Sequence, residues 1–128
     1  RFRVGGTVIG SITTTNGTST AYNTSSDYRL KENITLLDGA IARLNQLSVH
    51  RFNFIADPDT VVDGFIAHEA QEVVPECVTG TKDAVDADGN PVMQGIDQSK
   101  LVPLLTAALQ EAIAKIESLE ARLTAAGL

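Results

Sequence analysis

The spacing of apolar residues changes its period along the chain. In residues 1–25 the apolar side chains alternate with polar ones as they do in short strands, and Asn16-Gly17 is a dipeptide that favours a hairpin. Large apolar residues are few in this segment, so one copy buries too little surface to offset the entropy of ordering it. We expect it to pair with other copies of itself or with chain that precedes it.

From Leu37 onward the apolar spacing becomes helical, with steps of three and four residues, and it then returns to alternation. Asp, Pro and Gly residues separate the apolar runs, as turns require. The predicted elements are a helix over 37–47, a strand over 49–55 closed by a turn at 57–59, a strand over 64–67 and a short helical piece over 68–74.

Residues 76–96 have the pattern of a hairpin whose tip is 86–91. Asp86, Asp88 and Asn90 resemble the first half of a calcium-binding loop. The pattern fails because Asp97 takes the place of the bidentate Glu at the twelfth position. We therefore predict a solvated turn and no metal site.

The last third of the chain has the clearest periodicity. Its apolar residues form an a/d seam of three heptads, which predicts a helix over about 99–125 with Asp97 or Ser99 as its cap. Additional apolar positions widen the stripe beyond a two-stranded seam, and they suit either a trimeric bundle or a helix that also packs on its own domain. The seam is Val102, Leu105, Leu109, Ala112, Ile116, Leu119 and Leu123, and the additional positions are Leu101, Leu104, Ala108 and Ile113.

The composition of the chain argues against nucleic acid and membranes as partners. The chain has 16 acidic and 10 basic residues and a net charge of −6, with no Lys/Arg cluster that would neutralise a phosphate backbone, so we expect no nucleic-acid partner. No run approaches the roughly 20 apolar residues that span a bilayer, and we expect a soluble chain. The single cysteine, Cys77, cannot form an internal disulfide and is expected to be buried and inert. Because the chain begins at Arg1 rather than Met, we expect it to be part of a longer protein.

A serine and a lysine lie five residues apart where the strand-like pattern gives way to charged, leucine-rich sequence. A serine hydroxyl is a weak nucleophile until a base takes its proton, and a lysine amine can be that base when burial or a nearby cation such as Arg29 disfavours its charge. Ser26 and Lys31 meet this description. The spacing alone equally suits a first helical turn capped by Ser26 or Asp27, with Lys31 in solvent.

Three stretches of the chain together resemble a known family. They are Ser25-Ser26-Asp27-Tyr28-Arg29-Leu30-Lys31-Glu32-Asn33-Ile34, Gly64-Phe65-Ile66-Ala67-His68-Glu69-Ala70-Gln71-Glu72-Val73-Val74-Pro75-Glu76, and Leu101-Val102-Pro103-Leu104-Leu105 with the helix that follows. In this order they resemble the C-terminal intramolecular chaperone and self-cleaving domain of bacteriophage tailspikes and tail fibres, the S74 peptidase family. The resemblance covers residues 25–128, and residues 1–24 resemble the end of a fibre stem.

The resemblance implies a domain that trimerises, templates the folding of an intertwined β-structured stem and then cuts itself off. It assigns Ser26 as the nucleophile and Lys31 as the general base, with cleavage between Ser25 and Ser26; the Ser26-Asp27 bond is the neighbouring candidate. Asp27, Arg29 and Asn33 are expected to support this pair by positioning the backbone or tuning Lys31. No cofactor and no metal are implied.

The expected fold is α+β: a small mixed domain of short strands and hairpins with a long C-terminal helix in a trimeric coiled coil, preceded by a β-rich stem segment. Residues 1–25 are then the end of the stem, which is the folding client, and residues 26–128 are the chaperone. The expected partners are two further copies and the chain's own stem, with no membrane. The expected location is the virion tail, reached from the host cytoplasm, where the cut chaperone is released.

Two other functions are compatible with parts of the pattern. Residues 26–128 could stay on the fibre as a receptor-binding or capping tip that is never cut. Related self-cleaving domains also occur in membrane-tethered transcription factors, but that arrangement needs a DNA-binding region upstream and a membrane span downstream, and this sequence has neither.

Overall fold

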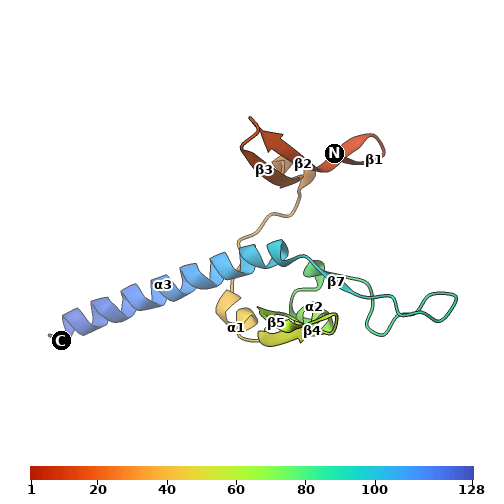
Figure 1. The fold of residues 1–128 in the computed structure, drawn as a ribbon. Coiled ribbons are helices and arrows are strands. Elements are labelled where there is room, and N and C mark those ends of the chain that lie inside the picture. Colours follow the sequence, from red (N-terminus) through yellow and green to blue (C-terminus); the bar gives the residue numbers. More distant parts are fainter. The chain divides into compact units, whose positions relative to one another are not determined.

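The computed structural model describes residues 1–128, apart from the side chain of Thr15. The chain forms two compact units, residues 1–36 and residues 37–128 (Figure 1). Short antiparallel strands and a long C-terminal helix confirm the predicted α+β class. The trimer, and the division into client and chaperone between residues 25 and 26, remain predictions.

The first unit is built on a three-stranded antiparallel sheet of order β1-β2-β3, formed by Phe2–Val4, Thr7–Thr15 and Ser19–Thr24. Asn16 and Gly17 have φ of 51° and 71°, the left-handed values that a tight hairpin needs, so the predicted hairpin is confirmed. After the sheet comes a single 3-10 turn, η1 (Tyr28–Leu30).

The second unit opens with α1 (Ala40–Leu44), which is shorter than the helix predicted over 37–47. Gly39 takes φ of 62°, a left-handed conformation that cannot belong to a right-handed helix, so the helix starts only after it. Leu37 has helical spacing to Ile41, but the backbone leaves the helical conformation between them at Gly39, and the apolar pattern does not show this break.

A β-hairpin follows α1, made of β4 (His50–Phe54) and β5 (Asp57–Gly64). The strand predicted over 49–55 is confirmed, but the turn predicted at 57–59 is wrong, because an irregular register pairs Phe54 with Asp57 and puts those residues in β5. Pro58 is tolerated there since a strand of a two-stranded sheet has a free edge.

The strand predicted over 64–67 is also wrong. Gly64 ends β5, and α2 (Ala67–Val73) begins three residues later, in line with the helical piece predicted there. Phe65 and Ala67 of this apolar run pack against the core from a connection and a helix start, not from a strand. Such a short run does not distinguish these cases by itself.

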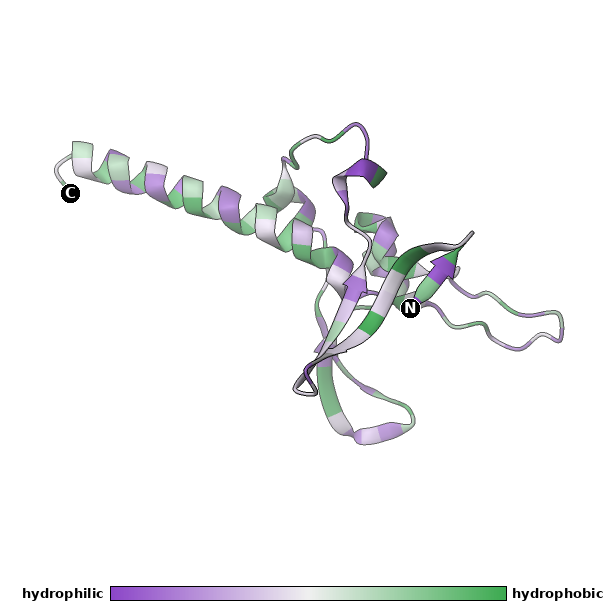
Figure 2. Ribbon diagram, turned by 90° about the horizontal axis from the view of Figure 1, so that it is seen from above, coloured by the Kyte–Doolittle hydropathy of each residue, from purple (hydrophilic) through white to green (hydrophobic). Residues whose placement is uncertain are grey.

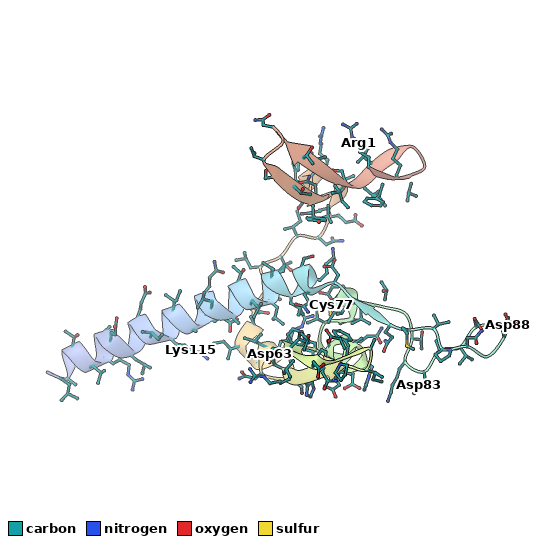
Figure 3. The ribbon with its side chains drawn as sticks, viewed as in Figure 1. Arg1, Asp63, Cys77, Asp83, Asp88 and Lys115 are labelled. Atoms are coloured by element: carbon teal, nitrogen blue, oxygen red, sulfur yellow. The ribbon has the colours of Figure 1, made fainter. Side chains whose placement is uncertain are left out.

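The predicted hairpin over 76–96 is confirmed in outline. The turn η2 (Pro75–Cys77) leads into β6 (Val78–Thr79), which pairs with β7 (Gly95–Ile96), and a bridge joins Val85 and Pro91 near the tip. Figure 3 shows Asp83 and Asp88 on this projecting arm, away from the rest of the second unit.

The Asp86 carboxylate closes the tip of the arm. One of its oxygens accepts hydrogen bonds from the backbone N–H groups of Asp88 and Asn90, each at 2.9 Å, and the bonds from Asn90 lower the pKa of Asp86. This is the solvated turn that the sequence predicts, with the carboxylate occupied by its own backbone.

The chain ends in η3 (Gln98–Leu101) and the 24-residue helix α3 (Val102–Ala125). Asp97, one of the two predicted caps, caps η3 by accepting from the Ser99 N–H at 3.0 Å, and η3 continues directly into α3. At the other end Gly127 takes φ of 77°, and Leu128 N donates to the Leu123 carbonyl at 3.0 Å, the hydrogen bond of a Schellman ending. The predicted helix is confirmed.

The core of the second unit is small, and α3 contributes side chains to it from one face only. Leu104, at 2 % exposure, faces inward, whereas seam residues Leu109 and Ile116 remain 63 % and 55 % exposed in the single chain. Figure 2 shows hydrophobic residues continuing along α3 far beyond the part that lies over α1. Leu101, Leu104 and Ala108 thus pack on the helix's own domain, whereas Ile113 stays 46 % exposed and most of the seam is left open. The residues of this hydrophobic core are Ala40, Ala70, Val74, Cys77, Val78, Leu101, Leu104 and Ala108.

Glu111 of α3 caps the start of α1. Its Oε1 accepts from Ala40 N at 2.7 Å and its Oε2 from Ile41 N at 3.0 Å. Gly39, at the N-cap position of α1, has no side chain to do so. These two backbone hydrogen bonds lower the pKa of Glu111, so folding favours its ionised form.

We predict that Glu111→Gln lowers the melting temperature at neutral pH, because an amide has one acceptor oxygen for two N–H groups. A lowered pKa gives a contribution that is complete above the ordinary glutamate value of about 4.3 and is lost as pH falls through the folded value. The difference between wild type and variant should therefore shrink below about pH 4 when melting is followed by circular dichroism.

The matched control is Glu120→Gln, which removes a carboxylate from the exposed part of the same helix. Equal melting temperatures for Glu111→Gln and Glu120→Gln at neutral pH would contradict this role of Glu111.

Candidate functional site

Ser26 and Lys31 are in direct contact. Lys31 Nζ donates a hydrogen bond to Ser26 Oγ at 2.8 Å, and both side chains lie in the first unit, exposed in the single chain. The structure thus brings together the two residues that the sequence singles out. Their roles as nucleophile and base remain a prediction.

The η1 turn makes this contact by reversing the chain between the two residues. Leu30 N donates to the Asp27 carbonyl and Lys31 N to the Tyr28 carbonyl, each at 3.1 Å, which closes a 3-10 turn. Asp27 caps the turn by accepting from Arg29 N at 2.9 Å. The cap and the Ser26–Lys31 pair, which the sequence offers as alternatives, exist together.

Arg29 binds the Asp27 carboxylate with its side chain as well. Nε and Nη2 donate to the two carboxylate oxygens, each at 2.9 Å, a bidentate pair. The hydrogen bonds from Arg29 lower the pKa of Asp27, with a smaller contribution from the charge of Lys31, and Asp27 raises the pKa of Arg29. Because Arg29 neutralises the one carboxylate in the turn, Lys31 is left to contact Ser26 rather than Asp27.

Ser25, on the acyl side of the predicted scissile bond, is held by the sheet. Its N–H donates to the Ile9 carbonyl at 3.2 Å, and its Oγ donates to the Val8 carbonyl at 3.1 Å. Sequence reasoning named Ser25 only as part of the cut and missed this anchor. The available clue is the hairpin register, since a strand paired in register from the Asn16-Gly17 turn carries residue 25 to β2.

Asn33 lies just beyond the pair and takes φ of 51°, a conformation that asparagine tolerates better than most residues. It turns the backbone after Lys31, at the start of the connection to α1. This is compatible with the predicted backbone-positioning role, which remains a prediction.

Cys77 and the possible metal ligands form no comparable site among the described residues. Cys77 is buried, as predicted, and burial raises the pKa of its thiol, with Glu76 adding to the effect. Within the described part of the chain, no group of three or more His, Cys, Asp and Glu side chains is placed to hold a metal ion. No helix among the described residues is both long and apolar enough to cross a membrane.

Comparison with known families gives a match to Peptidase_S74, described as chaperone of endosialidase, over residues 26–79. The matched stretch begins at Ser26 and runs through η1, α1, the β4–β5 hairpin and α2 to the end of β6. It contains Lys31 and confirms the resemblance drawn from the sequence over residues 26–79. No curated protein matches the chain.

We predict that Arg29→Gln raises the pKa of Asp27 toward its ordinary value, because the variant loses the charged bidentate partner. Carboxyl carbon shifts in an NMR pH titration would measure it. Arg51→Gln is the matched control, since Arg51 binds Asp63 in the same way, at 2.8 Å and 3.2 Å, and lowers its pKa. That control should move Asp63 alone, and an unmoved Asp27 in Arg29→Gln would contradict the assignment.

Proposed function

We propose that the chain is a trimerising intramolecular chaperone of a phage tail fibre or tailspike, a proposal supported by the match of residues 26–79 to Peptidase_S74, the chaperone of endosialidase. It directs the folding of the stem that ends near residue 25 and then releases itself by cutting the Ser25-Ser26 bond. The observation that carries the proposal is the 2.8 Å contact between Ser26 Oγ and Lys31 Nζ, on the C-terminal side of that bond.

The proposed reaction is an intramolecular acyl transfer followed by hydrolysis. Lys31, as a neutral amine, takes the proton of Ser26 Oγ, and the oxygen attacks the Ser25 carbonyl carbon. The C–N bond breaks, the Ser26 nitrogen receives the proton as it leaves, and an ester joins Ser25 to Ser26 Oγ. Water then hydrolyses the ester, which yields the Ser25 carboxylate and restores the Ser26 hydroxyl beside a free amine.

In this proposal, assembly of the trimer converts Lys31 to the neutral base that the reaction needs. In the single chain Lys31 is exposed and donates to Ser26 Oγ, whereas a base must accept from it. Burial of the turn against neighbouring copies would disfavour the ammonium form and reverse the direction of the hydrogen bond. Arg29, which binds the nearby Asp27 carboxylate, would offset part of that anion's attraction for the ammonium.

The open seam of α3 supports the trimer. Apolar positions at heptad spacing remain about half exposed over most of the helix, and burying them between copies recovers hydrophobic free energy that one chain leaves unused. A C-terminal trimer holds three stems in register and raises their effective concentration, which favours slow, non-local strand pairing. Peptide hydrolysis is effectively irreversible, so the stem is kinetically trapped once the chaperone leaves.

We predict that the wild-type chain, synthesised in a cell-free reaction, splits into two fragments on a denaturing gel, with a new N-terminus at Ser26 by mass spectrometry. Ser26→Ala and Lys31→Ala should each abolish the cut, because one lacks the nucleophile and the other the base. Lys100→Ala removes an amine from η3 and should cut normally.

A Lys31→Ala variant that cuts as fast as wild type would rule out the Ser26–Lys31 pair. A wild-type chain that stays whole after the trimer has formed would favour the retained fibre tip.

We predict that Ile116→Asp prevents trimer formation, because it puts a charge in the apolar seam, and that it slows cleavage with it. Light scattering after size-exclusion chromatography would give the oligomeric state. Ser118→Asp, on the opposite side of α3, is the control and should remain trimeric. A trimeric Ile116→Asp chain would show that the seam is not the interface.

A further inference from the structure

The bond between Ser25 and Ser26 lies where the sheet of the first unit ends and the η1 turn begins. The last in-register pair of β2 and β3 is Gly10 with Thr24, and Ser25 adds the hydrogen bond from its N–H to Ile9. A second hydrogen bond, from Ser25 Oγ to the Val8 carbonyl, fastens the side chain to the same strand. The acyl half of the bond is thus held by β2.

The other half of the bond is held by a separate set of contacts. Ser26 Oγ accepts from Lys31 Nζ, and Lys31 is set by the turn that Asp27 caps. All of these lie within six consecutive residues, so the turn needs no strand pairing in order to form. The contacts that hold the nucleophile Ser26 are thus local in sequence. The contacts that hold the Ser25 carbonyl group depend on β2, which pairs with β3 through the hairpin and whose Ile9 lies 16 residues earlier.

We infer that Ser25 is a positioning residue through which the pairing of β2 with β3 controls the cut. This rests on the proposed self-cleavage and adds a second condition to it. Attack by Ser26 Oγ needs the Ser25 carbonyl in one orientation, and contributions of this kind are worth several powers of ten in rate. Without paired β2, the Val8 and Ile9 acceptors are not beside Ser25, and rotation about its backbone spreads the carbonyl over many orientations.

Trimer formation through α3 and strand pairing at the end of the stem then become two separate conditions for cleavage. A trimer can form through α3 while the end of a stem is unpaired or out of register. The anchor then keeps that chain uncut, because a register slip of one residue reverses the faces of β3 and moves Ser25 off Val8. Cleavage of each chain therefore depends on the strand pairing in its own β2–β3 hairpin.

The test follows cleavage of the full chain over time in a cell-free reaction, with trimer formation measured in parallel by chemical cross-linking. Gly17→Val forces a β-branched residue to φ of 71° in the hairpin turn, remote in sequence from the bond, and should slow cleavage by more than about tenfold without loss of the trimer. Gly127→Val makes the same change at the end of α3, where φ is 77°, and should cut at the wild-type rate.

Ser25→Ala tests the anchor with the hairpin intact, and it decides the matter if Gly17→Val aggregates. Loss of one hydrogen bond should slow cleavage about two- to tenfold. Ser25→Thr keeps the hydroxyl and should restore most of the rate, which an effect on folding alone would not do. Ser19→Ala makes the same substitution at the other end of β3 and should have no effect.

Wild-type rates in both Ser25→Ala and Gly17→Val would overturn the inference and leave the proposed function standing. A wild-type chain that is trimeric and never cut would overturn both. Slow cleavage in Ser25→Ala and Ser25→Thr alike would assign the effect to the size of the residue rather than to its hydroxyl, and would also overturn the anchor.

Discussion

A single chain buries few side chains, and half of those are small. Ala40, Ala70, Cys77 and Ala108 make up half of the buried hydrophobic residues of the second unit, with only two leucines and two valines beside them. Meanwhile the seam of α3 and the first sheet keep large apolar side chains in solvent. A chain of this length is expected to bury most of its apolar surface, and the proposed trimer would cover part of what the single chain leaves exposed.

The contact between α1 and α3 shows how the second unit holds a shape despite its small core. A five-residue helix behind a left-handed glycine has no stability of its own. Glu111 supplies the missing cap from α3, and Ala40, fully buried, lets the two helices approach closely. The N-terminal half of α3 is thereby fixed to its domain through one face, while the opposite seam stays available.

The candidate site combines contacts of very different range. The Ser26–Lys31 pair and its Asp27–Arg29 support arise within one turn. The residue types and their spacing allowed this pair, and the family resemblance favoured it over a capped turn with Lys31 in solvent. The anchor of Ser25 arises from a register between strands, and it could not be predicted from the spacing of the motif. In the proposed mechanism the first set supplies the chemistry and the second supplies the timing.

The sequence alone determined the elements whose cause is local: the Asn16-Gly17 hairpin, the helical segment that Asp97 caps and that continues as α3, the Asp86 turn and the Ser26–Lys31 spacing. Only the tertiary structure decided that α1 starts after Gly39, that β5 begins at Asp57, and which side of α3 is buried. The physical reason is that a backbone break, a register shift and a choice of face depend on partners distant in sequence, such as Glu111 for α1. Apolar spacing records that a face exists, but not what covers it.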